Sequence, residues 1–265
     1  MATYLKPGES FKFSGSTEHF YHLVLQYLLP LFEMELTDGV VGKSFVVRDC
    51  GPMNVWFDFV FGPDAFSIVS RESFSHLSSR RFWDKRIELD TFANRDGLTV
   101  DATRFAEVLA AFREKFVPPG TSSDTVTVLD RRPPPSFYVD GRAENPGGGS
   151  TRRSINNLDQ LSHKISERTN VRLVDLGEMS PAGQLEVISN TRVLVGQHGA
   201  GLLHSLFMND DASVVEMKLK ESQDHFQILN EALGRTYRAF YLGEEHATLS
   251  PQLIAQIVDE VSVGS

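Results

Sequence analysis

The sequence has one cysteine, Cys50, in 265 residues. A single cysteine excludes an internal disulfide and is typical of a protein from a reducing compartment. We interpret Cys50 as a small buried apolar residue rather than as a nucleophile. The sequence also lacks any Asn-x-Ser/Thr acceptor for N-glycosylation, which agrees with a chain that is not glycosylated in a secretory pathway.

Long apolar runs and an excess of basic residues are missing too. No run approaches the ~18–20 apolar residues of a membrane span, and residues 1–9 lack the apolar segment of a signal peptide. We therefore expect no membrane span and a cytoplasmic enzyme of bacterial or viral origin, or a trimmed piece of a secretory-pathway protein. The net charge of -9 argues against nucleic acid as a partner but leaves room for a local cationic pocket. Nothing in the sequence indicates an oligomeric state.

Two common nucleotide-binding fingerprints are absent. The spacing Gly196-x-x-Gly199-x-Gly201 is not the G-x-G-x-x-G of dinucleotide-binding proteins, and no G-x-x-x-x-G-K-[ST] phosphate loop occurs. A nicotinamide dehydrogenase and a P-loop ATPase are therefore disfavoured. His19 and His22 are three residues apart but have no evident carboxylate or thiolate partner, so we predict no metal site.

The second half of the chain alternates short apolar runs with amphipathic segments. These predict strands at 126–129, 171–176, 192–195, 213–217 and 236–241, and helices at 156–168, 180–189, 222–233 and 251–261. Ser180 is the expected N-cap of the second of these helices, with Pro181 at its first position. Such alternation predicts an α/β fold built on a parallel sheet.

The first half is less regular. We expect an extended lead-in over 1–18, a buried helix over 19–32 that ends or kinks near Pro30, and strands at 44–48 and 66–69. An aromatic-rich element covers 55–61, residues 71–97 stay unassigned, and a helix over 101–116 has Asp101 as its N-cap.

Composition also suggests how the chain is divided. The Pro/Gly/Ser-rich residues 118–123 indicate a domain boundary. We predict an N-terminal domain (1–120), a C-terminal domain (121–250) and a closing helix (251–265) that can pack back on the N-terminal domain. The segment between the strand at 126–129 and the helix at 156–168, with three consecutive prolines and a glycine run, predicts a mobile lid or binding loop.

The most informative stretch is 193–208, Val-Leu-Val-Gly-Gln-His-Gly-Ala-Gly-Leu-Leu-His-Ser-Leu-Phe-Met. It reads as a short strand, a glycine turn and the start of a helix. That layout presents backbone N–H groups and the positive end of a helix dipole to an anion, and glycines allow close approach. His198 adds a side-chain donor. The alternative is a tight turn whose glycines serve packing alone.

Other polar residues follow the predicted strands, where ligands of parallel sheets bind. Glu216 could accept hydrogen bonds from ribose hydroxyls, or it is a solvated charge at the end of a strand. Arginine side chains suit phosphate oxygens, although on loops they can equally be surface charge. The arginines in question are Arg131, Arg132, Arg152 and Arg153.

The motif His198-Gly-Ala-Gly201, with Ser213-Val-Val-Glu-Met217 downstream, resembles the signature of glycosyltransferase family 61. Two further stretches match in order: residues 126–132 resemble its strand-plus-arginine element, and 152–157 resemble its arginine-rich helix start. Residues 19–30 are similar to its N-terminal histidine helix. The family includes plant xylosyl- and arabinosyltransferases and O-GlcNAc transferases.

The resemblance implies a GT-B fold, that is, two Rossmann-like domains with parallel sheets facing a central cleft. It implies an inverting transferase that moves xylose, GlcNAc or arabinose from a nucleotide-diphosphate sugar, UDP-linked by expectation, to a hydroxyl of a glycan or glycoprotein. No metal or other cofactor is required. The donor-binding residues are expected to be Arg131, Arg132, Arg153, Asn156, Gln197, His198, Gly199, Ala200, Gly201 and Glu216.

The general base is expected on the N-terminal domain, with His22 and His19 as first candidates and Asp49 and Asp58, placed at strand ends, as second ones. Gln26 stands where the family pattern leads us to expect an acidic residue one turn after the histidine. The competing hypothesis is therefore a catalytically inactive nucleotide- or sugar-binding module of the same fold.

Overall fold

The structure is a computed structural model that describes residues 3–7, 16–40, 45–74, 85–89, 91–92, 100–119 and 124–262. The chain forms two compact units. Unit 1 comprises Met1–Phe112 and Ala143–Asn145, and unit 2 comprises Arg113–Arg142 and Pro146–Ser265. The predicted linker at 118–123 falls largely outside the described residues, as does Ser44 at the start of a predicted strand. The functional division into acceptor-side and donor-side domains stays a prediction.

Unit 2 is built on a five-stranded parallel sheet. Its strands are β5 (Val126–Leu129), β7 (Val171–Val174), β8 (Val193–Gln197), β9 (Ser213–Lys218) and β10 (Thr236–Tyr241), in the order β10-β9-β8-β5-β7. All pairs are parallel, which confirms the α/β prediction. The first strand, β5, has the second on one side and the third on the other. The direction of winding therefore reverses between β5 and β8, and in such sheets ligands bind at the carboxyl ends beside this point.

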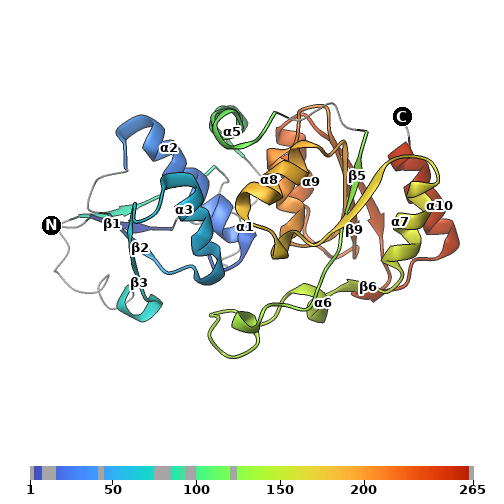
Figure 1. Ribbon diagram of the computed structural model, residues 1–265, viewed down its shortest axis with the longest axis horizontal. Helices are drawn as coiled ribbons and strands as arrows, with labels where there is room; N and C mark the ends of the chain where they lie inside the picture. Colours follow the sequence, from blue (N-terminus) through green and yellow to red (C-terminus); the bar gives the residue numbers. More distant parts are fainter. Residues whose placement is uncertain are drawn as a thin grey trace. The chain divides into compact units, whose positions relative to one another are not determined.

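Helices cover both faces of this sheet. Figure 1 shows α8 (Pro181–Ser189) and α9 (His225–Ala232) on one side, and α7 (Leu158–Ser166) and α10 (Pro251–Ser262) on the other. Ser180 Oγ accepts a hydrogen bond from Gly183 N at 3.3 Å, which confirms the predicted N-cap. Ile257 on α10 packs with Leu161 on α7 and Val128 on the sheet in one buried cluster. The apolar face of α10 is thus buried within unit 2, and packing of 251–265 on the N-terminal domain stays a prediction.

The helix expected after the glycine turn is present as a 3₁₀ helix, η5 (Ala200–Phe207). A second, two-stranded parallel sheet of β6 (Ser154–Ile155) and β11 (His246–Ala247) was not predicted. Two-residue strands carry almost no periodicity, so sequence patterns cannot reveal them.

The segment after β5 contains the short helices η3 (Ser136–Tyr138) and α6 (Gly149–Arg152). Two backbone hydrogen bonds connect its first part with its last part: Ser150 N donates to Arg132 O at 2.9 Å, and Gly147 N donates to Tyr138 O at 2.9 Å. Gly149 has a φ of +50°, which favours glycine. Its lack of a side chain lets the backbone at 149 approach the Arg132 backbone, because a Cβ at Gly149 would lie 2.3 Å from Arg132 O. The role of this segment as a lid or binding loop stays a prediction.

Unit 1 contains a four-stranded parallel sheet in the order β3-β2-β1-β4. Its strands are β1 (Thr3–Lys6), β2 (Phe45–Arg48), β3 (Ser67–Val69) and β4 (Lys85–Glu88). The expectation of an extended lead-in over 1–18 was wrong for β1, which lies in the middle of the sheet, between β2 and β4. Leu5 is fully buried there. Four residues with a single aliphatic side chain give too weak a pattern to identify a central strand.

The buried helical segment of unit 1 continues through Pro30, so the alternative that it ends there was wrong, whereas a kink near Pro30 stays a prediction. It consists of α1 (Phe20–Leu23), a π-helical turn, η1 (Val24–Leu28), and α2 (Leu29–Asp38). Proline removes one N–H and its ring clashes with the carbonyl four residues earlier. The wider π turn immediately before α2 changes that spacing, so the helical path continues.

The elements expected at 55–61 and 101–116 of unit 1 are both helical. The aromatic-rich element is α3 (Val55–Phe61), preceded by the 3₁₀ turn η2 (Gly51–Asn54). The predicted amphipathic helix is α5 (Ala102–Phe116), and Arg104 N donates to Asp101 Oδ1 at 3.2 Å, which confirms Asp101 as its cap. Edge-to-face contacts between aromatic rings fill the core, for example Phe32 with Phe112 at a centroid distance of 5.2 Å.

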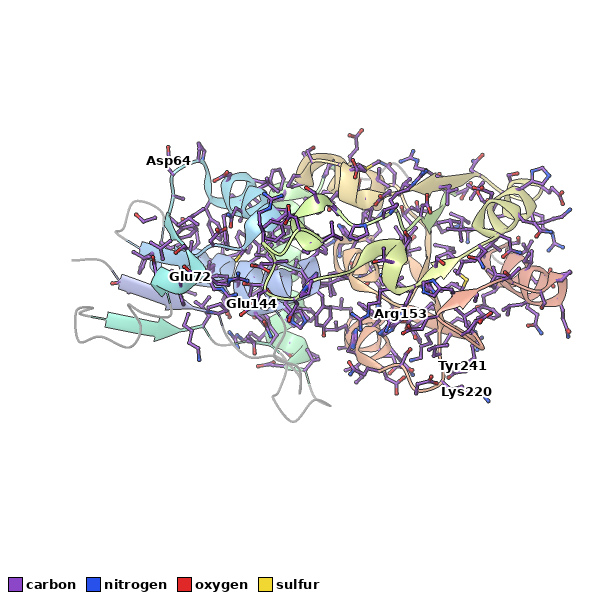
Figure 2. The ribbon with its side chains drawn as sticks, turned by 90° about the horizontal axis from the view of Figure 1, so that it is seen from below. Asp64, Glu72, Glu144, Arg153, Lys220 and Tyr241 are labelled. Carbon is purple, nitrogen blue, oxygen red and sulfur yellow. The ribbon has the colours of Figure 1, made fainter. Side chains whose placement is uncertain are left out.

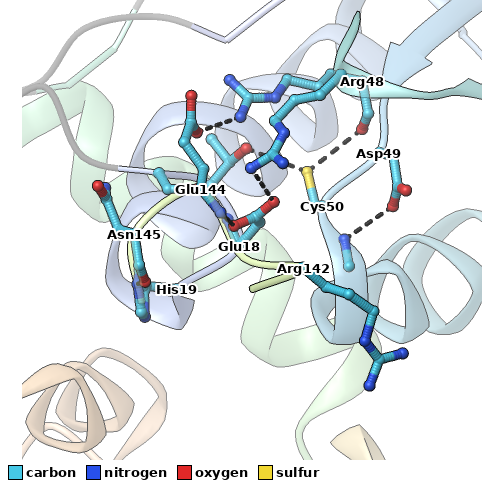
Figure 3. A network of polar contacts seen from close by, with 12 residues as sticks. Glu18, His19, Arg48, Asp49, Cys50, Arg142, Glu144 and Asn145 are labelled. Atoms are coloured by element: carbon cyan, nitrogen blue, oxygen red, sulfur yellow. Dashed lines mark hydrogen bonds and ion pairs between the residues drawn. The ribbon is translucent and has the colours of Figure 1, made fainter. Parts of the chain in front are cut away.

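A polar network in unit 1 fixes residues Ala143–Asn145 (Figure 3). Glu18 is 3% exposed, and its carboxylate contacts Arg71 Nη1 at 3.1 Å and accepts from Glu144 N at 2.7 Å. Arg48 forms an ion pair with the Glu144 side chain. Cys50 is fully buried and contacts Thr17 Oγ1 at 3.2 Å. Burial raises the pKa of the Cys50 thiol to about 12, so the prediction of an inert buried cysteine is confirmed.

Candidate functional site

The candidate site lies in unit 2, where β5 and β8 end next to each other. Arg131 follows β5 by two residues, and His198 directly follows β8. Because β5 and β8 are neighbours in the sheet, residues that are 67 positions apart in the sequence meet here. This edge is the place where the strand order predicts a ligand.

A buried histidine–carboxylate pair forms the base of the site. His198 Nδ1 and Glu216 Oε1 are 2.5 Å apart, and the two residues are 8% and 0% exposed. The other carboxylate oxygen, Glu216 Oε2, accepts a hydrogen bond from the hydroxyl of Tyr237. Glu216 lies inside β9 rather than at the end of the strand, and both of its oxygens have protein partners. The interpretation of Glu216 as a solvated strand-end charge was therefore wrong.

Two arginine side chains converge on the same backbone carbonyl. Arg131 Nη1 donates to His198 O at 3.0 Å, and Arg153 Nη1 donates to it at 3.3 Å. Arg153 Nε lies 3.4 Å from Glu245 Oε1, whereas none of the described carboxylates lies within ion-pair distance of Arg131. Burial and the neighbouring charges of Arg153 and Arg152 lower the pKa of Arg131 to about 10. An anion bound here would relieve the repulsion between these cations.

The glycine turn is needed for close packing around the arginine. Gly199 has extended backbone angles (φ 164°, ψ 171°), which any residue can adopt. A Cβ at Gly199, however, would lie 2.9 Å from Arg131 Nη1. Gly201 meets only Leu129 Cδ1 at 3.3 Å. Ala200 begins η5, and the first N–H groups of a helix have no partner within the helix.

Gln197 ends β8 and is 6% exposed. Its amide nitrogen donates to Glu245 O at 2.8 Å and lies 3.5 Å from Ser154 O, so the side chain connects β8 to the small β6–β11 sheet. Its oxygen, Oε1, is buried and has no hydrogen-bond partner in the part of the chain that the structure describes.

Two of the predicted donor-site residues lie apart from this cluster. The Arg132 side chain is 66% exposed and pairs with Asp130 at 2.8 Å. Asn156 is also exposed, and its side chain donates to Thr248 Oγ1 at 3.2 Å. The structure thus brings together Arg131, Arg153, Gln197, His198, Gly199 and Glu216 around one strand end.

The base candidates are all in unit 1. His22 is half-buried, and burial followed by the charge of His19 lowers its pKa to about 4. His19 Nε2 lies 3.2 Å from Asn145 O, within the network of Figure 3. Asp49 directly follows β2, and its Oδ1 accepts from Gly51 N and Asn54 Nδ2 at 2.8 and 2.7 Å.

Asp58 differs from its predicted position. It lies on the exposed side of helix α3, not at the end of a strand. A seven-residue aromatic-rich segment satisfies the patterns of a helix and of a buried strand equally well, so periodicity alone could not decide between them.

Sequence reasoning missed Tyr237 and Glu245. Tyr237 is the second residue of β10, and strand alternation places it on the same face as Ala239, the residue paired with Glu216. The contact between Tyr237 and Glu216 depends on the register of β9 and β10, which a single sequence does not reveal. Glu245 lies in the turn before β11, and it contributes both a carboxylate near Arg153 and a carbonyl for Gln197.

The described ranges contain no cluster of three or more His, Cys, Asp or Glu side chains arranged to hold a metal ion. No helix within them combines the length and the apolar character that crossing a membrane requires.

Comparison with known proteins gives consistent matches. The chain is 29% identical over 102 residues to the EGF domain-specific O-linked N-acetylglucosamine transferase of Drosophila melanogaster, covering 38% of this chain and 19% of that protein. It is 28% identical over 127 residues to the beta-1,2-xylosyltransferase of Arabidopsis thaliana (43% and 23%). It is 41% identical over 69 residues to the Mus musculus EGF domain-specific O-linked N-acetylglucosamine transferase (24% and 13%).

The matched regions thus span less than a quarter of the length of each of these relatives. The family model for Glycosyltransferase 61 matches residues 20–215, which is more than half of the chain and includes the histidine–glycine turn and β9 up to Val215. The resemblance found in the sequence motifs is confirmed: this chain belongs to the glycosyltransferase 61 family.

Proposed function

We propose that the protein is a glycosyltransferase that takes its donor sugar from a nucleotide diphosphate, UDP by expectation, and transfers it to a hydroxyl of a glycan or glycoprotein. The observation that carries this proposal is the convergence of Arg131 and Arg153 on one carbonyl beside His198. Two half-buried guanidinium groups lie close enough to lower each other's stability as cations, and only Arg153 has a carboxylate, Glu245, within ion-pair distance among the described residues, so the pair favours an additional anion. A diphosphate supplies the oxygens that arginine side chains bind best.

The proposed reaction is a single in-line displacement with inversion. An acceptor hydroxyl oxygen attacks C1 of the sugar, the bond from C1 to the diphosphate oxygen breaks, and the diphosphate leaves with the electron pair. A general base takes the proton of the hydroxyl. Arg131, Arg153, His198 and the N–H groups that begin η5 stabilise the charge that grows on the leaving group, without a required metal.

We propose a different role for Glu216 from the ribose contact that the sequence suggested. The carboxylate is fully buried, and its oxygens contact His198 and Tyr237. It holds Nδ1 of His198, which leaves Nε2 as the nitrogen for the ligand. Among the described residues, none forms a hydrogen bond with Nε2 of His198. The arrangement is that of a histidine oriented by a carboxylate.

A GT-B organisation is part of the same proposal. Each unit contains a parallel sheet, as each domain of that fold requires. Unit 1 would then be the acceptor-side domain, with His22 and His19 as the first candidates for the base and Asp49 and Asp58 as the second ones. A pKa of about 4 makes His22 neutral at pH 7 but weakly basic.

One observation favours the second candidate, an inactive binding module. Gln26 is 3% exposed and stands where an acidic residue was expected, one turn after His22. The two functions differ in slow donor hydrolysis. An active transferase releases some sugar from the donor to water, whereas an inactive module binds the nucleotide without cleaving it.

The test uses alanine variants at three arginines, with calorimetric binding of UDP and the rate of sugar release from UDP-xylose, UDP-GlcNAc and UDP-arabinose. Arg131→Ala and Arg153→Ala should each reduce the rate roughly 10²–10³-fold, as expected for loss of one charge-stabilising donor. Arg132→Ala is the matched control, since its exposed side chain lies outside the cluster. Near wild-type turnover in both site variants would refute the assignment.

A further inference from the structure

Tyr237 does not take part in the proposed displacement, yet it completes a chain of contacts that ends at the candidate site. Its hydroxyl donates to Glu216 Oε2, and Glu216 Oε1 contacts His198 Nδ1 at 2.5 Å. The three residues come from β10, β9 and the turn after β8. We propose that Tyr237 is a positioning residue that fixes Glu216 and thereby presents Nε2 of His198 to the donor diphosphate. This inference rests on the proposed function of the site.

Because Glu216 is buried, its carboxylate depends on hydrogen bonds from neighbouring residues. Its side chain is 0% exposed, and β9 lies between β8 and β10 in the sheet. A buried carboxylate is costly unless hydrogen bonds satisfy its oxygens. One donor comes from each neighbouring strand: Tyr237 from β10, and His198 from the end of β8. Removing either donor leaves one carboxylate oxygen without its partner and free to turn.

The direction of the hydrogen bonds follows from the chemistry of the groups. Burial and the charge of Glu216 raise the pKa of the Tyr237 phenol, so the phenol stays protonated and donates. An ionised carboxylate only accepts, and therefore His198 must donate from Nδ1. In the neutral imidazole, Nε2 then carries the lone pair, and in the charged form it carries a proton that a phosphate oxygen can accept.

The surroundings of His198 restrict its ring from the other sides. The His225 and Phe226 rings of α9 lie 5.2 and 5.4 Å from it, measured between centroids. Arg131 and Arg153 bind its carbonyl oxygen. Glu216 is thus the carboxylate that contacts the imidazole, and Tyr237 holds that carboxylate from the opposite side.

The experiment compares Tyr237→Phe with Tyr241→Phe. The first variant keeps the aromatic ring and removes the hydroxyl from Glu216. The second removes the same group from the same strand at a residue that is 54% exposed and labelled in Figure 2. Two measurements are made on each: the proton position on the His198 ring, from imidazole nitrogen NMR of the unliganded protein, and the affinities for UDP and uridine.

We expect wild type and Tyr241→Phe to hold the proton of neutral His198 on Nδ1 alone. Tyr237→Phe should give a mixture of both tautomers and weaken UDP binding about tenfold, consistent with loss of a hydrogen bond to a charged group. Affinity for uridine, which has no phosphate, should stay within twofold. In a His198→Asn background, which lacks Nε2, the same tyrosine change should alter UDP affinity less than twofold.

The outcomes separate this inference from the proposed function. An unchanged tautomer in Tyr237→Phe, or an equal loss of affinity in the His198→Asn background, would overturn the positioning role. A shifted tautomer without any dependence of UDP affinity on His198 would confirm the link from Tyr237 to His198 and overturn its role in presenting Nε2 to the diphosphate. The diphosphate site itself would be refuted only if UDP affinity were also unchanged in Arg131→Ala and Arg153→Ala. Loss of uridine affinity in parallel with UDP would reduce Tyr237 to a general structural role.

Discussion

Gly199→Ala is expected to weaken nucleotide binding without destabilising the fold. The new Cβ would lie 2.9 Å from Nη1 and 3.2 Å from Cζ and Nη2 of Arg131, so the guanidinium must move. The backbone at Gly199 is extended, and alanine adopts it without strain. The guanidinium is the far end of a flexible side chain, so it can move at little cost to the fold, but it then leaves the position in which the proposed site binds a phosphate oxygen. Loss of one hydrogen bond between Arg131 and the diphosphate, about 1.5–3 kcal/mol, corresponds to a ~10–100-fold weaker complex with UDP.

Two neighbouring glycines provide the controls for this prediction. Gly201→Ala meets a single methyl group, Leu129 Cδ1, at 3.3 Å and should keep UDP affinity within about twofold. Gly196→Ala meets Leu202 at 3.0 Å and Leu129 at 3.1 Å, both in the core, and should lower the melting temperature. Calorimetric titration with UDP and thermal unfolding of all three variants measure these effects on affinity and stability. If Gly199→Ala bound UDP as wild type does, or lost stability as Gly196→Ala does, the assignment of Arg131 would be refuted.

Three further predictions concern stability and cofactors. Gly149→Ala should lower the free energy of unfolding by at least about 2 kcal/mol more than Gly141→Ala in urea titrations, because its Cβ would overlap Arg132 O whereas that of Gly141 meets nothing within 4 Å. Burial lowers the pKa of His204 from 6.5 to about 4, so the unfolded chain binds its proton more tightly. Unfolding free energy should therefore fall by about 3 kcal/mol as the pH drops from 6.5 to 4, a slope that His204→Gln removes and the exposed-site change His163→Gln leaves intact. Excess EDTA should leave sugar release from the donor unchanged; loss of activity that Mn²⁺ or Mg²⁺ restores would refute a metal-free reaction.

The secondary structure of unit 2 was largely predictable because its elements are long or strongly patterned. β5 and β10 have the predicted bounds, and α8 begins at the predicted Ser180 cap. The path of the chain through Pro30 was not predictable, because continuation depends on a π turn that sequence patterns do not encode. β1 was missed for a similar reason: its assignment depends on the two strands that pair with it.

The candidate site was predictable in its residue types but not in its contacts. Alternation of strands and helices predicts that Arg131 and His198 both follow the carboxyl ends of strands in one parallel sheet. That these two strands are neighbours, which brings the residues within hydrogen-bond distance, is seen only in the structure. The sequence pattern does not distinguish Arg131 from Arg132. The backbone conformation after β5 decides which of these two adjacent side chains points into the site. The roles of Glu216 and Tyr237 depend on how far along β9 and β10 each lies, and that register forms only in the folded sheet.

The buried thiol of Cys50 has a practical consequence for biophysical work. With one cysteine in the chain, fully buried and with a pKa of about 12, the wild-type protein should react slowly with maleimides. Dyes or spin labels can then be attached at introduced cysteines without first replacing the native one. Leu36 in unit 1 and Val139 in unit 2, at 53% and 61% exposure, are suitable attachment points. A label pair at these positions would measure the distance between the two units in solution, with and without UDP.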